Sequence, residues 1–317
     1  MMVKQQGIGT SHAKIILMGE HSVVYGQPAI ALPLPSVQLS VTLSSRQDNQ
    51  RIIKSRYYHG SLGNLPSSMI GIKKLIDTLS ARFNDHETGW DLKIESQLPA
   101  ERGMGSSAAS AIAIIRAFFD YYDEPLDRTL LLQLADVEEQ ITHRSPSGLD
   151  AATVSSDKPL FYVKGRIGVP IEMNLDASLV IADTGKKGAT KEAILAVKDE
   201  LKNNNEKAEG HIKHLGELVN QTKDYLTQND IVKLGDALNF AQTDLAALNV
   251  SDPSLDHLIH VARDNGALGA KLTGGGRGGC MIALMQTAMG ARRLASILKE
   301  NGAHDIWLQP LDKRGNN

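Results

Sequence analysis

Alternating apolar and polar residues mark two stretches of this chain, at 38–44 and 90–95. Because the side chains of a strand alternate between its two faces, both stretches are predicted to be strands with one buried face. An unbroken apolar run at 178–182 predicts a strand buried on both faces. Further strands are predicted at 15–18, resuming at 23–25 beyond a polar corner, at 52–53, twice within 158–169, at 281–285 and at 306–308.

Apolar residues three and four positions apart predict amphipathic helices at 67–83 and 127–141, each starting at a residue type that caps helices well, Ser or Asp. The stretch 108–119 is apolar almost all round, with Ser110 and Arg116 as its only polar residues, and is predicted to be a buried helix. The pattern stays mostly helical from 191 to 265, with breaks near 203–205, 228–230 and 249–253, and one more helix is predicted at 287–300.

The chain changes character in a turn-rich stretch near 165–178. A length of 317 residues suggests about two domains. We therefore expect an N-terminal domain at 1–170 and a C-terminal domain at 171–317.

Composition and charge narrow the classes of partner. The 34 Lys and Arg residues nearly balance the 36 Asp and Glu residues, and both signs are scattered, so nothing favours nucleic acid or an anionic membrane. No apolar run of about 18 residues occurs, and the first residues lack the apolar core of a signal peptide. The single cysteine, Cys280, excludes an internal disulfide and fits a cytoplasmic protein, in which we expect it to be a buried small residue.

The segment 99–110 joins a predicted strand to the buried helix through a glycine-rich turn. The first N–H groups of a helix have no acceptor within it, and the helix dipole favours negative charge there. Gly103 and Gly105 could let the backbone approach a phosphate closely. Ser106 and Ser107 offer hydroxyls to phosphate oxygens or to a metal. The alternative is an ordinary capped helix after a tight turn, and the segment lacks both the Gly-Lys-Ser/Thr ending of a Walker A loop and the third glycine of a dinucleotide-binding loop.

Ionisable residues gather at the polar corner after the first apolar run. Lys14, Glu20 and His21 lie within eight residues of one another, a pattern that both an active site and a chance surface cluster produce. Glu138 and Glu139 lie near the C-terminal end of a predicted helix, where the dipole disfavours negative charge. Either a compensating cation, from the protein or a metal, or plain solvation would explain them.

Two more segments carry candidate chemistry. Asp150 follows a turn with Pro146 and Gly148, and a carboxylate held by a rigid turn suits proton abstraction, although aspartates also occur in turns for structural reasons. The segment 274–279 holds five glycines in six residues, which favours a close approach of the backbone to another group. By contrast, His211 and His214 could share a helix face but have no third ligand in view, and are predicted to be solvated.

Two glycine-rich loops, a lysine, a glutamate at a helix end and an aspartate in a tight turn together fit phosphoryl transfer, which needs a phosphate cradle, metal ligands and a group that handles the attacking hydroxyl. The segments 14–21, 99–109 and 271–280 resemble, in order, three motifs of the GHMP family of small-molecule kinases. The segments 19–26 and 145–150 are most similar to the family members that phosphorylate mevalonate.

The resemblance implies an α+β, two-domain GHMP-kinase-like fold with the active site in the inter-domain cleft. It implies transfer of phosphate from ATP to the primary hydroxyl of mevalonate, with Mg²⁺, and it leaves a homodimer open. Asp150 would be the catalytic carboxylate with Lys14 near it, and Ser107 and Glu139 would hold Mg²⁺. The family's spacing of eleven residues between the glutamate and the aspartate selects Glu139 over Glu138.

The other implied roles fall into three sets. The ATP side takes in Arg102, Gly103, Met104, Gly105, Ser106, Ser107, Ala108 and Ser110. The substrate side takes in Glu20, His21, Ser147 and Thr190. The third-motif loop consists of Thr273, Gly274, Gly275 and Gly276.

Some residues depart from the family pattern or stay without a motif. Arg102 stands where the family usually has an uncharged residue, and its side chain could contact ATP or sit in solvent. Arg144, Lys186 and Lys187 are candidates to meet the substrate's carboxylate.

Three alternatives remain in view: a phosphomevalonate kinase, a diphosphomevalonate decarboxylase on the same fold, and a non-catalytic sensor of ATP and a ligand. The Gly-Glu-His corner argues against the first two, and the Glu139 spacing also argues against the decarboxylase. The sensor is disfavoured because Lys14, Ser107, Glu139 and Asp150 are all retained.

Overall fold

The computed structural model describes residues 3–85, 88–99, 102–142 and 148–311. It divides into two compact units, each assembled from several stretches of sequence. The boundary predicted at residues 170 and 171 is not where the units divide, because the first two strands and the glycine-rich turn each run from one unit into the other. Unit 1 consists of Met1–Ala13, Val37–Ala100 and Gly105–Ser156, and unit 2 of Lys14–Ser36, Glu101–Met104 and Asp157–Asn317.

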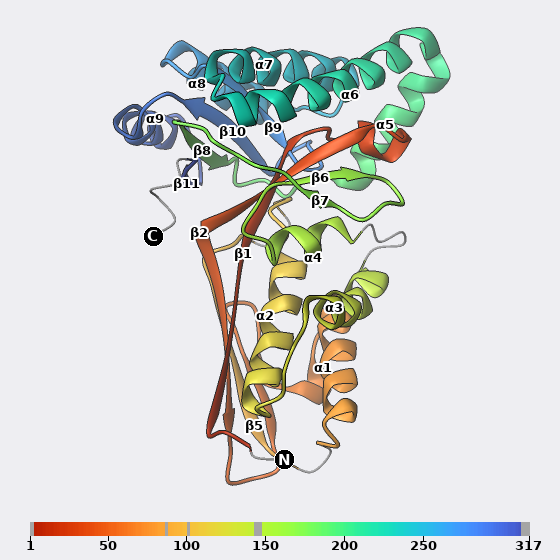
Figure 1. Ribbon diagram of the computed structural model, residues 1–317, viewed down its shortest axis with the longest axis vertical. Coiled ribbons are helices and arrows are strands. Elements are labelled where there is room, and N and C mark those ends of the chain that lie inside the picture. Colours follow the sequence, from red (N-terminus) through yellow and green to blue (C-terminus); the bar gives the residue numbers. More distant parts are fainter. Residues whose placement is uncertain (1–2, 86–87, 100–101, 143–147, 312–317) are drawn as a thin grey trace. The chain divides into compact units, whose positions relative to one another are not determined.

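Unit 1 combines a sheet with a layer of helices (Figure 1). The later part of β2 (Pro28–Ser45) pairs antiparallel with β5 (Trp90–Ser96), which pairs parallel with β3 (Arg51–Lys54). Strand β3 also pairs with β4 (His59–Ser61), and β1 (Gln6–Met18) pairs with β2. Helices α1 (Ile70–Arg82), α2 (Ser106–Tyr121) and α3 (Arg128–Thr142) pack on one another, and α4 (Leu149–Val154) packs on α2 and α3.

The core of unit 1 forms where α2 meets the sheet. Trp90 of β5 contacts Phe118 of α2 edge to face, with ring centroids 5.8 Å apart, and both side chains are fully buried. Aromatic pairs in this geometry stabilise a core beyond their buried area. The prediction that the segment 108–119 is a buried helix is therefore confirmed, and α2 is packed on the sheet near its C-terminal end.

Unit 2 contains a four-stranded antiparallel sheet in the order β11, β8, β10, β9. Its strands are β8 (Ser178–Asp183), β9 (Gly269–Thr273), β10 (Cys280–Met285) and β11 (Asp305–Pro310). Helices α8 (Pro253–Asp264) and α9 (Ala288–Glu300) pack on this sheet, and α7 (Ile231–Ala247) packs on β9 and on α6 (Asn205–Gln228), which contacts α5 (Thr190–Asn203). The early part of β2 pairs with β6 (Leu160–Val163), and β6 with β7 (Val169–Pro170).

The predicted mixture of helix and sheet is confirmed, with local corrections. The strand expected at 23–25 is wrong, because Ser22–Tyr25 forms a 3-10 helix in which the Val24 N–H donates to the His21 carbonyl at 3.0 Å. The helix expected from 67 begins at Ile70 after a 3-10 turn, and its cap is not a serine. Among the described residues, no helix has both the length and the apolar character needed to cross a membrane.

Candidate active site

The glycine-rich turn before α2 changes direction at two glycines in the left-handed backbone conformation. Gly103 has a φ of 79° and Gly105 a φ of 76°, angles that residues with a Cβ rarely adopt. Gly105 is the N-cap of α2, so Ser106 opens the helix. The predicted order of strand, turn and helix is confirmed, and it supplies the unpaired N–H groups that an anion site needs.

Within unit 2, the first half of this turn contacts both other motifs. The Lys14 N–H of β1 donates to the Met104 carbonyl at 3.0 Å, and Met104 itself is buried. A Cβ at Gly103 would stand only 3.3 Å from the Cα of Gly274 in the third-motif loop. The three segments singled out in the sequence thus meet through their backbones.

The hydroxyls at the start of α2 have different partners. The Ser110 hydroxyl donates to the Ser106 carbonyl at 2.9 Å, inside the helix. The Ser107 hydroxyl donates to Glu138 Oε1 of α3 at 2.5 Å. The Ser107 side chain therefore points toward a carboxylate, as that of a metal-binding serine would, whereas the Ser110 hydroxyl donates to the backbone.

Glu138 and Glu139 are both buried, with 3% and 6% exposure, so plain solvation does not explain them. Glu138 Oε1 accepts from Ser107 and from the Thr142 hydroxyl, each at 2.5 Å. Glu139 Oε1 accepts from the Gly148 N–H at 3.2 Å. The family spacing selected Glu139 as the partner of Ser107, but the structure brings Ser107 to Glu138, which the sequence reasoning set aside.

This cluster of oxygen atoms fits Mg²⁺. In the described part of the chain no lysine or arginine forms an ion pair with Glu138, although its carboxylate is buried beside the Ser107 hydroxyl. Buried carboxylates require a compensating charge, and Mg²⁺ prefers carboxylate and hydroxyl oxygens. Ser107, Glu138 and Glu139 are therefore the residues that would hold the ion.

Asp150 lies in the first turn of α4, after Gly148, whose φ is 68°. Glu139 is tied to the same turn through the Gly148 N–H. Lys14 is buried, with 4% exposure, and belongs to unit 2, whereas Asp150 belongs to unit 1. The approach of Lys14 to Asp150 therefore stays a prediction. Ser147 and Arg144 lie outside the described residues.

The polar corner is built around a buried ion pair. Lys271 of β9 donates to Glu20 Oε1, and neither side chain has any solvent exposure. Lys271 also donates to the Leu272 carbonyl at 2.7 Å. Burial raises the pKa of the Glu20 carboxyl and lowers the pKa of the Lys271 ammonium, while each charge favours the other. Lys271 has a role that the sequence reasoning missed, because its partner lies 251 residues away in the chain.

His21 lies beside this pair and faces the third-motif loop. Its Nε2 is 3.0 Å from the Gly275 carbonyl, and burial lowers the pKa of the imidazole. A Cβ at Gly275 would collide with the side chain of Thr190 at the start of α5. Thr273 closes the group, since its hydroxyl donates to the Ile16 carbonyl at 2.9 Å. Glu20, His21, Thr190 and the third-motif loop are thus brought together in unit 2.

The remaining candidates are placed as follows. Arg102 is neither in solvent nor free, since its guanidinium is bonded to Asp183 and to the Gly185 carbonyl. Lys186 is exposed, with its Nζ 3.7 Å from Asp252. Cys280 is fully buried, so the prediction of a buried small residue is confirmed, and burial raises the pKa of its thiol.

Contrary to the prediction, His211 and His214 are not simply solvated. Their Nδ1 atoms lie 2.8 and 2.7 Å from the two oxygens of Asp244, a buried carboxylate of α7. The shared carboxylate orients both rings and links α6 to α7. No periodicity in the sequence pointed to Asp244, because it belongs to another helix.

Two family models and a set of named relatives match this chain. Residues 71–157 match the family model described as the GHMP kinases N terminal domain, and residues 222–304 match the GHMP kinases C terminal model. A relative from Pyrococcus horikoshii named mevalonate kinase is 31% identical over 300 residues, covering 87% of this chain and 88% of the relative.

Solved structures similar to this chain also include mevalonate kinases. A mevalonate kinase from methicillin-resistant Staphylococcus aureus superposes with a TM-score of 0.78 and 31% identity, over 97% of this chain and 99% of its own. The L. major mevalonate kinase in complex with R-mevalonate gives a TM-score of 0.85 at 23% identity, over 98% of this chain and all of its own, which shows a likeness of fold.

Proposed function

Because the chain belongs to the GHMP kinase family, we propose that it transfers the γ-phosphate of ATP to the primary hydroxyl of mevalonate, giving 5-phosphomevalonate and ADP. The observation that supports this most is the match, over most of both chains, to a relative named mevalonate kinase. The arrangement of the motifs in each unit is consistent with the reaction. A homodimer and a cytoplasmic location stay predictions.

The turn before α2 binds the phosphates of ATP. Gly103 and Gly105 hold the backbone in the conformation that leaves the first N–H groups of α2 available, and the dipole of this 16-residue helix favours the negative charge. No lysine of a Walker loop is present, so backbone donors carry this role. Closely placed backbone N–H groups are fixed before the substrate arrives, which lowers the cost of binding.

Ser107, Glu138 and Glu139 would hold Mg²⁺ beside the phosphates. The ion would supply positive charge against the charge that develops there. The burial of both glutamates raises the strength of their interaction with a cation, because water screens it little. Thr142 and the Gly148 N–H orient the two carboxylates.

Asp150 acts on the hydroxyl of mevalonate. Its carboxylate accepts the hydrogen bond, and then the proton, of the primary hydroxyl as that oxygen attacks the γ-phosphorus and ADP leaves. The fixed turn at Gly148 limits the directions that Asp150 can take, which serves orientation as much as basicity.

The substrate contacts come from the corner and the third-motif loop. His21 is kept neutral by burial, so it can donate or accept a hydrogen bond without adding charge. Thr190 is an exposed residue whose hydroxyl lies beside Gly275. Glu20 is fully buried against Lys271, and this ion pair stabilises the corner and the third-motif loop.

A substrate panel tests the proposal. The purified protein is given ATP and Mg²⁺ with mevalonate, phosphomevalonate, diphosphomevalonate, homoserine or galactose, and ADP release, carbon dioxide release and ligand binding are measured. We expect turnover with mevalonate alone. Turnover with phosphomevalonate only, release of carbon dioxide, or binding without turnover would replace the proposal with one of its three alternatives.

A further inference from the structure

Arg102 is fastened at two points of the guanidinium. Its Nε donates to Asp183 Oδ2 at 3.0 Å, and its Nη2 donates to the Gly185 carbonyl at 2.9 Å. The same Asp183 accepts the Gly185 N–H on Oδ1 at 2.9 Å. Arg102, Asp183 and Gly185 all belong to unit 2, and Arg102 immediately precedes Gly103. The arginine thus connects the first residue of the glycine-rich turn to the end of β8.

Burial makes this connection strong. The Arg102 side chain is 14% exposed and the Asp183 side chain 2%. Water screens such a pair much less than a surface ion pair, and the planar fork of a guanidinium fixes direction as well as distance. Asp183 also lies with His304 and Asp305 in a group of metal-ligand type, but its carboxylate already has the Arg102 charge as counter-ion.

The third-motif segment meets the same place. Thr184 donates to the Gly279 carbonyl through both its N–H, at 3.0 Å, and its hydroxyl, at 2.8 Å. The Gly279 N–H donates to the Lys186 carbonyl at 2.8 Å. A Cβ at Gly279 would stand 3.1 Å from the Arg102 carbonyl oxygen, so the two segments are in close contact.

We propose that Arg102 is a positioning residue of the phosphate-binding turn, which acts through Asp183 and does not contact ATP. It holds the backbone of residues 102–104 against β8 and the third-motif loop, so that Gly103 and Gly105 present their neighbours' N–H groups in one arrangement. Its Nε and Nη2 already donate to Asp183 and to the Gly185 carbonyl within the protein. This proposal rests on the proposed function in one respect, that the turn before α2 binds ATP.

A double-mutant cycle tests the proposal. The variants are Arg102→Ala, Asp183→Asn and both together, where the Asn keeps an acceptor for the Gly185 N–H but places a donor opposite Arg102. The affinity for Mg·ATP is measured by calorimetry, and KM values are measured for ATP and mevalonate. We expect each single variant to weaken ATP binding about tenfold and the double variant to be no worse, because residues that act as one unit are not additive.

A direct contact predicts different results. If Arg102 touched the phosphates, Asp183→Asn would release the guanidinium and leave ATP binding equal or tighter, and the cycle would be additive. Arg102→Lys adds a test of the positioning role. A lysine still offers charge to a phosphate but cannot reproduce the fork toward Asp183 and Gly185, so unchanged ATP binding in this variant overturns positioning.

A measurement without nucleotide covers variants that bind ATP poorly for other reasons. Hydrogen exchange of peptides spanning 99–110 and 183–187 is followed in the apoprotein. Faster exchange in both peptides of Arg102→Ala supports the proposal, and unchanged exchange overturns it. If the wild-type protein binds ATP but does not phosphorylate mevalonate, the proposed function fails while the cycle and the exchange still decide the role of Arg102.

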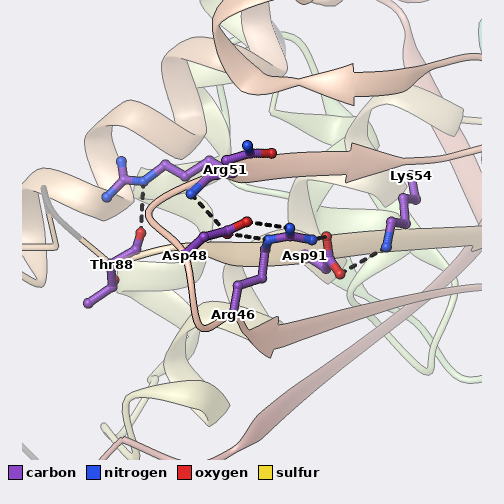
Figure 2. A network of polar contacts seen from close by, with 7 residues as sticks. Arg46, Asp48, Arg51, Lys54, Thr88 and Asp91 are labelled. Carbon is purple, nitrogen blue, oxygen red and sulfur yellow. Dashed lines mark hydrogen bonds and ion pairs between the residues drawn. The ribbon is translucent and has the colours of Figure 1, made fainter.

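Arg46 supplies a matched control in unit 1. Figure 2 shows its guanidinium bonded to Asp48 and Asp91, while Lys54 bonds to the other oxygen of Asp91. The pair of bonds to Asp48, both 2.7 Å long, equals that of Arg102 in number. Arg46→Ala should leave ATP affinity and exchange at 99–110 unchanged. Equal effects of Arg46→Ala and Arg102→Ala would overturn the proposal, since any lost arginine pair would then suffice.

Discussion

The buried pair of Glu20 and Lys271 can be dissected one charge at a time. Lys271→Met keeps much of the length of the side chain but removes the ammonium. Neither side chain is exposed, and Glu20 Oε2 has no hydrogen-bond partner in the described part of the protein. Removing Lys271 therefore leaves a buried carboxylate without its counter-charge.

The expected loss is large. Breaking a buried ion pair by removing one partner costs about 3–5 kcal/mol. Since about 1 kcal/mol shifts the midpoint of a 150–250-residue domain by about 2–4 °C, Lys271→Met should melt about 6–20 °C below the wild type. The double variant Glu20→Gln, Lys271→Met contains no stranded charge, so we expect it to recover most of the loss.

The loss should also depend on pH with a definite sign. Burial raises the pKa of the Glu20 carboxyl above 4.5, and Lys271 is the first group that opposes the rise. In Lys271→Met the folded protein therefore keeps a proton that the unfolded chain releases above pH 4.5. The unfolded state then binds fewer protons than the folded one, so the stability of the variant should fall as the pH rises from about 5 to about 8.

Thermal unfolding followed by circular dichroism at both pH values measures these effects. Lys213→Met serves as control, because Lys213 is 77% exposed and its ion pair with Glu217 lies on the surface of α6. A Lys271→Met protein that melts with the wild type, or one that gains stability toward pH 8, would refute the account of this pair.

Three further predictions concern other buried groups. Glu138→Gln should raise the Mg²⁺ concentration needed for ATP binding by about 10–100-fold. Titration of Mg²⁺ measures this, and the metal-binding role would return to Glu139 if Glu139→Gln raised that concentration while Glu138→Gln did not. Burial lowers the pKa of His21 below 6.5, so the unfolded chain takes up the proton first and stability should fall as the pH drops below 6.5; urea unfolding should show that His21→Gln lessens this fall. Asp244→Ala removes the acceptor of two imidazoles and should cost about 1–3 kcal/mol in urea unfolding, and a wild-type midpoint would count against these bonds.

Much of the fold follows from local pattern. Segment 108–119 had an apolar surface on all sides, and it forms the buried helix α2 against the sheet. Strand β9 was not predicted, because Gly269 and Lys271 interrupt its apolar run. Every one of its residues is nevertheless buried. The strand prediction at 23–25 was wrong, because the β-branched residues of Ser22–Tyr25 lie in a 3-10 helix between two turns.

The candidate site depended on contacts that sequence spacing does not encode. Local residue pattern was enough to locate the glycine-rich turn before α2 and the two glutamates near the end of α3. The partners of Glu20, of His211 and of Arg102 lie on segments distant in the chain, and only the folded structure brings them close. A choice between Glu138 and Glu139 likewise depends on which carboxylate turns toward Ser107, a matter of side-chain direction rather than of spacing.

The central claim is the transfer of phosphate to mevalonate with Asp150 at the hydroxyl. Phosphorus-31 NMR of a reaction with ATP, Mg²⁺ and mevalonate follows both products directly, for the wild type and for Asp150→Asn. We predict that the wild type forms a phosphomonoester resonance and ADP in equal amounts, and that Asp150→Asn binds ATP normally but forms the ester several orders of magnitude more slowly. A wild type that forms no ester from mevalonate, or an Asp150→Asn protein that turns over at the full rate, would contradict the account.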